Sequence, residues 1–242
     1  MEEKQKLSKD LINFFAEHLK HHKEETKRKK LLEIEKNFTF GEELFNSITH
    51  GVGALLAIAI LVLIIVFSQN TSEVVGMTLF GSTAVFMYLM STIYHALPQG
   101  KTKDVFLRLD QISFYILIAG TYTPLCFIAF PGALGWVIFG LQWGLALIGV
   151  IFKAIWVDKF EFIHVIIYLL MAWTFIFFIV PLLNGPMTII AFIFLVVGGL
   201  CYSIGLIFYI FTWFKFHHGL WHLFVLAGTI LHFFTMLNLL LN

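Results

Sequence analysis

The sequence predicts an all-α, polytopic membrane protein whose chain crosses the bilayer seven times. The composition is the first reason, because 59% of the 242 residues are hydrophobic and only 13% are charged, with a mean hydropathy of +0.87. Soluble domains usually contain about 25% charged residues. The second reason is that the charges gather at one end, and the third is a series of apolar stretches, each about 20 residues long, which is the length that a membrane-spanning helix needs.

Several other classes of protein are excluded by the same composition. The net charge of +1 lacks the excess of positive charge that attracts a nucleic acid. The two cysteines, Cys126 and Cys201, are too few for a disulfide framework or a thiolate zinc site of the finger type. Disorder requires low hydrophobicity and high net charge, and most of this chain has neither.

We predict two regions, a charged arm over residues 1–40 and a membrane domain over residues 41–242. The arm holds 10 of the 16 Lys and Arg residues and 8 of the 15 Asp and Glu residues. It has no apolar core or small-residue cleavage site, so it is not expected to be a secretory signal peptide. Apolar residues recur at helical spacing from Leu7 to Leu19 before a basic run at 27–30. This pattern fits either an amphipathic helix on an anionic membrane face or a solvated helical tail.

The predicted spans follow one another from the end of the arm to the C-terminus. They cover approximately Ile48–Phe67, Val74–Leu97, Val105–Phe130, Ala133–Phe152, Phe162–Val180, Met187–Phe211 and Gly219–Leu241. Turn and breaker residues separate several of them, such as those at 98–100 and 184–186. Pro124 lies inside the third span and should kink it or end it early. The boundary between the third and fourth spans is the weakest, because only residues 131–132 interrupt the apolar run.

The positions of the basic residues predict the orientation of the chain. All 16 Lys and Arg residues fall in the arm and in the second, fourth and sixth loops. Cytoplasmic segments of membrane proteins carry the excess of Lys and Arg. We therefore predict a multi-pass protein of the cell membrane, with the N-terminus in the cytoplasm and the C-terminus outside.

Ionisable residues inside membrane spans are rare and mark functional sites. The candidates here are Glu43, His50, His95, Asp110, His164, His218, His222 and His232. The predicted topology brings polar groups of four helices to the cytoplasmic ends of their spans, namely Glu43, Asn46, His50, Ser91, His95, Asp110, His218 and His222. His232 lies elsewhere, about 15 Å further along the last helix at 1.5 Å per residue.

Spacing within these helices points to a metal site. His218 and His222 are four residues apart, as are Ser91 and His95, so each pair shares one helix face. Three histidines with an open fourth position form a catalytic zinc site, and His95, His218 and His222 supply that set. Asp110 is the carboxylate available to hold and deprotonate a metal-bound water. Ser91 is placed to hydrogen-bond that water or a substrate carbonyl.

Simpler interpretations exist for some of these residues. A single histidine in a membrane helix commonly makes an interhelical hydrogen bond, and we expect that role for His50, His164 and His232. His217 points about 100° away from its neighbour on a helix and is expected at the membrane interface. A pair of histidines four residues apart is by itself a weak motif, but the convergence of five polar residues at one depth favours a metal site.

Four segments together resemble the bacterial hemolysin III family. Residues 42–51 look like the signature of its first helix, and residues 91–95 match its SxxxH motif. Residues 109–111 with 120–124 match its third-helix signature, and residues 218–222 match its terminal HxxxH motif. The resemblance covers about residues 41–242 and leaves out the arm. This family belongs with the progestin and adipoQ receptors and is more distantly similar to alkaline ceramidases.

The resemblance implies a fold and a site. It implies seven helices with a cytoplasmic N-terminus, and a zinc ion held by three histidines that correspond to His95, His218 and His222. It also implies that Asp110 and Ser91 contact the zinc-bound water or the substrate. These are the five residues that spacing and depth select.

Three functions are compatible with these features. The first is a zinc-dependent hydrolase of a lipid amide or ester in the bilayer, with a role in membrane lipid homeostasis. The second is a non-catalytic protein of membrane homeostasis or sensing, in which zinc joins the second and seventh helices. The third is the pore-forming cytolysin that the family name suggests, against which the seven apolar spans argue. A light-driven pump is excluded, because no helix interior contains a lysine for a retinal Schiff base.

Overall fold

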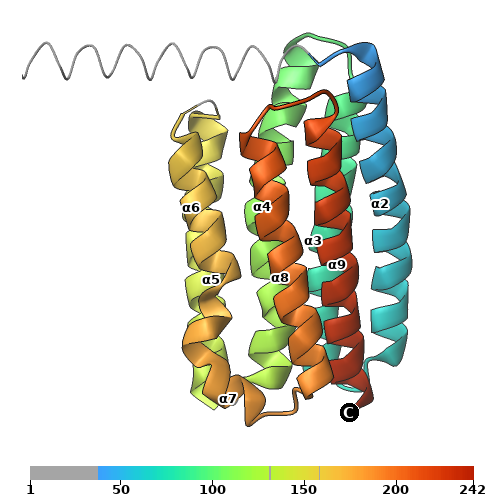
Figure 1. Ribbon diagram of the computed structural model, residues 1–242. Coiled ribbons are helices and arrows are strands. Elements are labelled where there is room, and N and C mark those ends of the chain that lie inside the picture. Colours follow the sequence, from blue (N-terminus) through green and yellow to red (C-terminus); the bar gives the residue numbers. More distant parts are fainter. Residues whose placement is uncertain (1–37, 131, 158) are drawn as a thin grey trace, which may run out of the picture. The chain divides into compact units, whose positions relative to one another are not determined.

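The computed structural model describes residues 38–130, 132–157 and 159–242. Within these residues it contains seven helical spans that are long and apolar enough to cross a membrane, and no strand. The spans lie side by side along one direction (Figure 1). The predicted all-α membrane fold is therefore confirmed. Residues 1–37 of the predicted arm lie outside the described residues, so the arm and its separation from the membrane domain stay predictions.

Each predicted span corresponds to one helix or to one run of consecutive helices. The elements are α2 (Phe40–Phe67), α3 (Thr71–Ala96), α4 (Lys101–Pro124), the π-helix η1 (Leu125–Ala129), α5 (Gly132–Ile155), α6 (Glu161–Ala172), the 3-10 helix η2 (Thr174–Phe178), α7 (Ile179–Leu183), α8 (Ile189–Ile210) and α9 (His217–Leu241). The third span consists of α4 and η1, and the fifth consists of α6, η2 and α7.

The first helix begins well before the start that hydropathy predicts. Helix α2 starts at Phe40, whereas the apolar stretch starts at Ile48. The extra turns contain Glu42 and Asn46, which together with His50 are spaced four residues apart and are all buried. They form one face of the helix, which is turned toward the protein. Because these residues are polar, a count of apolar residues places the helix start too late.

Pro124 changes the course of the third span, as predicted. It is the last residue of α4, and the chain continues as the π-helix η1. Proline has no backbone N–H and its ring crowds the preceding turn, so the regular α-helical hydrogen bonds are interrupted there. The backbone N–H of Phe130 donates to the carbonyl of Leu125 at 3.0 Å and closes the wide turn.

The fifth span is interrupted, which the sequence analysis did not predict. A side chain from α4 enters its backbone: the Tyr122 hydroxyl donates to the carbonyl of Ala172 at 2.8 Å and accepts from the N–H of Phe175 at 2.9 Å. A side chain inserted into the helical hydrogen-bond ladder is a known cause of such breaks. The helix tightens to a 3-10 turn at this point and resumes as α7.

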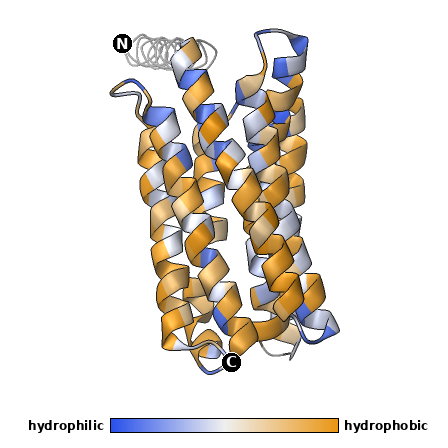
Figure 2. Cartoon of the chain, turned by 90° about the vertical axis from the view of Figure 1, so that its right-hand side faces the viewer, coloured by the Kyte–Doolittle hydropathy of each residue, from blue (hydrophilic) through white to orange (hydrophobic). Residues whose placement is uncertain are grey.

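The outer faces of the helices are apolar, as a bilayer requires. Large hydrophobic side chains such as Leu55, Phe162 and Phe177 are more than two-thirds exposed, and Figure 2 shows hydrophobic residues along most of the length of the helices. The protein interior holds its own apolar core, which includes Phe80 and Met236. The exposed apolar surface is the part that lipid would cover.

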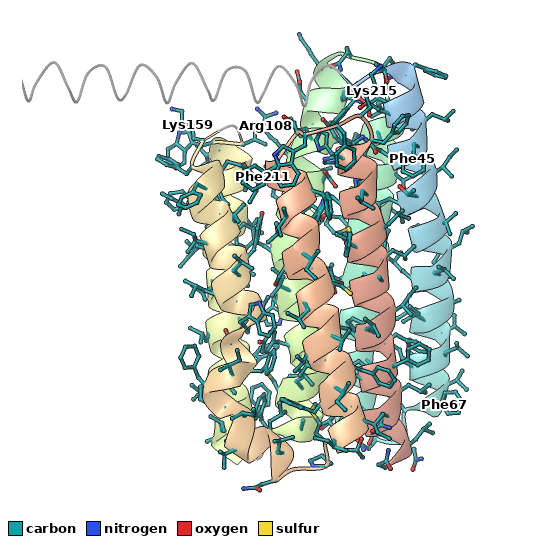
Figure 3. The ribbon with its side chains drawn as sticks, in the orientation of Figure 1. Phe45, Phe67, Arg108, Lys159, Phe211 and Lys215 are labelled. Carbon is teal, nitrogen blue, oxygen red and sulfur yellow. The ribbon has the colours of Figure 1, made fainter. Side chains whose placement is uncertain are left out.

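The basic residues lie at one end of the bundle. Figure 3 shows Arg108, Lys159 and Lys215 together at the end opposite Phe67, and we call this the basic end. Helices α2, α4 and α9 begin there and α3 ends there, while the C-terminus lies at the other end (Figure 1). This agrees with the predicted sorting of charges, and the assignment of the basic end to the cytoplasm stays a prediction.

Candidate metal centre

Three buried histidines meet at the basic end of the bundle. His95 lies in the last turn of α3, and His218 and His222 lie in the first turns of α9. Each offers one ring nitrogen, and the three nitrogens lie within 4.8 Å of one another. The ring centroids are 5.1, 5.0 and 4.7 Å apart. The three histidines predicted from widely separated parts of the sequence therefore come together in an arrangement that could hold a metal ion.

Helix α2 fixes the start of α9 beside this cluster. The backbone N–H of Phe216, the residue before α9, donates to the Glu42 carboxylate at 3.1 Å. Gly219 allows close contact, because a Cβ atom there would overlap the ring of Phe45 and reach 3.0 Å from the Asn46 side chain. Small residues at helix interfaces let backbones approach closely in membrane proteins. This approach holds His218 and His222 against the polar face of α2.

Hydrogen bonds on the Nδ1 atoms set the tautomers of two of the histidines. His95 Nδ1 lies 2.6 Å from the Glu43 carboxylate, and His222 Nδ1 lies 3.1 Å from the backbone carbonyl of Asn46. A carbonyl or an ionised carboxylate only accepts hydrogen bonds, so both Nδ1 atoms carry the proton. The lone pair of each neutral ring is therefore on Nε2, which is the atom that would bind a metal.

Glu43 also contacts a buried lysine. Its other carboxylate oxygen accepts from the Lys103 ammonium at 2.7 Å. Lys103 donates as well to the carbonyls of Tyr94 and Leu97, at 2.9 and 3.1 Å. The sequence analysis placed Glu43 at this depth without a role and counted Lys103 as a loop charge. No sequence signal separates Lys103 from the other basic residues of the loops.

Ser91 and Asp110 lie beside the histidines and are both buried. Ser91 is one helical turn before His95 on α3, and it interacts with the Asp110 carboxyl on α4. Even so, the Ser91 hydroxyl and the Asp110 Oδ1 atom have no hydrogen-bond partner that meets normal geometry among the described residues. Buried polar atoms are almost always paired, so these two atoms are candidates to bind a water or a polar ligand.

The contacts of His50 differ from those predicted. Neither of its ring nitrogens makes a hydrogen bond within the described part of the chain. Instead, its ring stacks on His222, with centroids 3.5 Å apart and planes 12° apart. The side chain of Asn46, one turn earlier, is also buried and unpaired among these residues. The interhelical hydrogen bond expected for His50 is not formed with normal geometry among the described residues, although its ring also interacts with the backbone of His222 on α9.

The remaining membrane histidines have structural contacts. His164 Nδ1 lies 2.6 Å from the Tyr115 hydroxyl, and His232 Nε2 lies 3.3 Å from the carbonyl of Leu195, so both make the predicted interhelical hydrogen bonds. His217, expected at the membrane interface, is only 5% exposed, and its Nδ1 lies 2.9 Å from the carbonyl of Phe208. That position is buried because the chain folds back between α8 and α9.

A second, partly buried polar cluster lies at the basic end, and we call it the lysine cluster; its lysine is fully buried, whereas its glutamate side chain is 41% exposed. It consists of Gln111, Lys153, Glu161 and Tyr209. The ammonium of Lys153 donates to the Gln111 side chain, to the Glu161 carboxylate at 2.5 Å and to the carbonyl of Val157 at 3.4 Å. The Tyr209 hydroxyl donates to the other carboxylate oxygen of Glu161 at 2.7 Å. The cluster joins α4, α5, α6 and α8.

The chain is similar to several known proteins. It is 41% identical over 206 residues to the Hemolysin-3 homolog of Bacillus subtilis (strain 168), covering 83% of this chain and 95% of that protein. It is 40% identical over 199 residues to Hemolysin-3 of Bacillus cereus, covering 81% and 90%. A weaker match, 24% identical over 206 residues and covering 81% and 83%, is the human Monocyte to macrophage differentiation factor.

No solved structure matches the fold. The model of the family described as haemolysin-III related matches residues 38–233. This range contains all three clustered histidines together with Glu43, Ser91 and Asp110. The match spans most of the chain and agrees with the resemblance in four sequence segments and with the two relatives at about 40% identity. The chain therefore belongs to the haemolysin-III-related family.

Proposed function

We propose that this protein is a zinc-dependent hydrolase of the cell membrane that cleaves an amide or ester bond of a lipid and so contributes to membrane lipid homeostasis. The observation that carries the proposal is the group of three buried histidines around one point, together with the unpaired atoms of Ser91, one helical turn from His95, and of Asp110, which interacts with Ser91. A structural zinc site is closed by four protein ligands, whereas a catalytic site has three.

The donor atoms fit zinc. Imidazole nitrogen is a common zinc ligand, and the hydrogen bonds on Nδ1 of His95 and His222 leave their Nε2 atoms to bind the ion. Metal-binding histidines normally donate their other N–H to a carboxylate or a backbone carbonyl, and both kinds of partner are present here. When bound, zinc would supply a Lewis acid that polarises a carbonyl and activates water near neutral pH.

Residues of the chain would then transfer the proton of the attacking water and bind the substrate. Asp110 would accept the proton of the attacking water and return it to the leaving nitrogen or oxygen. Ser91, between His95 and Asp110, would donate a hydrogen bond to the substrate carbonyl or orient the water. A lipid is the expected substrate because the site lies inside a helix bundle whose outer surface is apolar.

Turnover of defined lipids by the purified protein tests this proposal. The protein in nanodiscs would be given a short-chain fluorescent N-acyl sphingosine and, separately, a fluorescent diacyl phospholipid. We expect cleavage of at least one, lost in His218→Ala and retained in His232→Leu, which changes a histidine of the same helix outside the cluster. Cleavage that survives in His218→Ala would contradict the proposed mechanism.

Two other functions would give different results. Helices α3 and α9 already contact each other through the hydrogen bond from Tyr88 to Thr229. Zinc held by His95, His218 and His222 would join them further even without catalysis. In that case chelation would lower the melting temperature and no lipid would be cleaved. The name of the relative from Bacillus cereus, Hemolysin-3, points to cytolysis, which predicts lysis of erythrocytes by purified protein whether or not the three histidines are intact.

A further inference from the structure

We infer that Glu43 is a positioning residue of the metal site: its carboxylate holds His95 in the tautomer and orientation that direct Nε2 to the metal, and Lys103 holds that carboxylate in place. The inference rests on the proposed metal site and adds residues from two further helices to it. Glu43 lies on α2, His95 on α3 and Lys103 on α4.

The contacts of Glu43 divide between its two oxygens. Oε2 accepts from His95 Nδ1 at 2.6 Å, and Oε1 accepts from Lys103 Nζ at 2.7 Å. The side chains of His95 and Lys103 are at most 4% exposed, and that of Glu43 is 14% exposed. Charge-assisted hydrogen bonds of this length are roughly twice as strong as neutral ones. The carboxylate is therefore a fixed partner of the His95 ring.

Lys103 is itself held from three directions. Its three N–H groups go to Glu43 and to the carbonyls of Tyr94 and Leu97, and its ammonium lies 4.6 Å from the centre of the Tyr94 ring. These carbonyls belong to the C-terminal end of α3, where a positive charge is favourable. Lys103 thus fixes the turn of α3 that carries His95 and also balances the charge of Glu43.

A histidine ligand that donates to a carboxylate gains in two ways. Its ring is held with one nitrogen toward the metal, and the carboxylate raises the basicity of that nitrogen. Loss of such a partner typically lowers metal affinity 10- to 100-fold. His222 has a neutral carbonyl in the corresponding place. Among these two ligands only His95 has a charged hydrogen-bond partner, so loss of that partner should lower the zinc affinity of the site.

Zinc affinity of Glu43 variants tests the inference. Wild type, Glu43→Gln and Glu43→Ala would be stripped of metal and titrated with zinc against a chelator of known affinity. Gln can still accept from Nδ1–H but has no charge, so we expect a loss of about 10-fold for Gln and nearer 100-fold for Ala. Glu73→Gln, at the far end of α3, is the matched control and should bind as wild type does.

A second measurement does not depend on metal. Nitrogen NMR of metal-free protein with labelled histidine reports which ring nitrogen carries the proton, and His95→Ala identifies the signals of His95. We expect Nδ1–H in wild type and in Glu43→Gln, and a mixture of tautomers in Glu43→Ala. If single variants fail to fold because Lys103 is left without a counter-charge, Glu43→Gln with Lys103→Met removes both charges and should still bind zinc weakly.

The outcomes separate this inference from the proposed function. Zinc affinity equal to wild type in both Glu43 variants would overturn the inference, and so would lower thermal stability with unchanged affinity and tautomer. If wild type takes up no zinc, the proposed metal site fails, and the tautomer measurement still decides whether Glu43 orients His95.

Discussion

Two clusters of polar residues lie at the basic end of the bundle, and they differ in how fully their buried atoms are paired. In the lysine cluster, Lys153 is wholly buried, and its ammonium has three acceptors. Both carboxylate oxygens of Glu161 accept hydrogen bonds. Beside the three clustered histidines, in contrast, the side chains of Asn46, His50, Ser91 and Asp110 retain unpaired atoms within the described residues.

We interpret the difference as one between a cluster that joins helices and a candidate functional site. Burying a polar group without a partner costs about 1–3 kcal/mol, and in a membrane no solvent is available to reduce that cost. The lysine cluster avoids the cost by closing on itself, and so it serves to join helices. Several unpaired atoms beside three potential metal ligands are explained if a metal, water and substrate complete the set.

The largest effect on turnover should come from Asp110. We expect Asp110→Asn to retain zinc and to lower lipid cleavage by about 100- to 10,000-fold, because the amide cannot accept the proton. Steady-state cleavage in nanodiscs, with zinc content measured on the same samples, checks this. Asp104→Asn, in the first turn of the same helix, is the control and should cleave normally. Normal turnover in Asp110→Asn would remove it from the mechanism.

The next effect concerns the stability of the lysine cluster. Lys153→Ala leaves Gln111 without its partner and removes the ion pair with Glu161, whose side chain is 41% exposed, so we expect it to lower the free energy of unfolding by about 1–2 kcal/mol. Lys153→Met keeps most of the volume and should cost less. Unfolding in detergent measures both variants. Zinc content should remain that of wild type, and its loss would show that the two clusters are not independent.

A smaller effect is expected for Ser91. Ser91→Ala removes one hydrogen bond to substrate or water, worth about 1 kcal/mol, so turnover should fall about tenfold or less. Zinc affinity should not change, since zinc in proteins is bound by His, Cys, Asp and Glu side chains. Ser203→Ala, which removes a hydroxyl of α8 that accepts a hydrogen bond from the Trp173 ring, serves for comparison. A loss of zinc in Ser91→Ala would mean that it supports the ligands directly.

The smallest effect is expected for His232, which lies outside both clusters. His232→Leu removes its hydrogen bond to the carbonyl of Leu195. Such interhelical bonds average about 0.6 kcal/mol in membrane proteins. The melting temperature should fall slightly, while zinc content and turnover stay as in wild type. A large loss of zinc in this variant would contradict the assignment of His232 to helix packing.

The sequence alone predicted the seven spans and the three clustered histidines. Both depend on local patterns: apolar stretches of membrane length, pairs of residues four apart, and the depth that the topology gives to each polar residue. His95, His218 and His222 were placed together because an even number of crossings returns the chain to the same side. The roles of Ser91 and Asp110 as catalytic residues remain predictions.

Contacts between side chains of different helices were not predictable in the same way. Lys103 and Lys153 are charged residues near helix ends, where the positive-inside rule counts them as solvated, and both are buried. The stacking of His50 on His222 and the insertion of Tyr122 into the fifth span depend on helix rotation and packing. The polar start of α2 was missed because its buried face is not apolar.

The metal content of the purified protein tests the central claim most directly. Wild type and the double variant His218→Ala with His222→Ala would be prepared in detergent without chelator and measured by plasma mass spectrometry. The three-ligand site predicts about one zinc per chain in wild type and none in the variant. Wild type without metal, or a variant that retains it, would contradict the account and reduce the histidine cluster to helix packing.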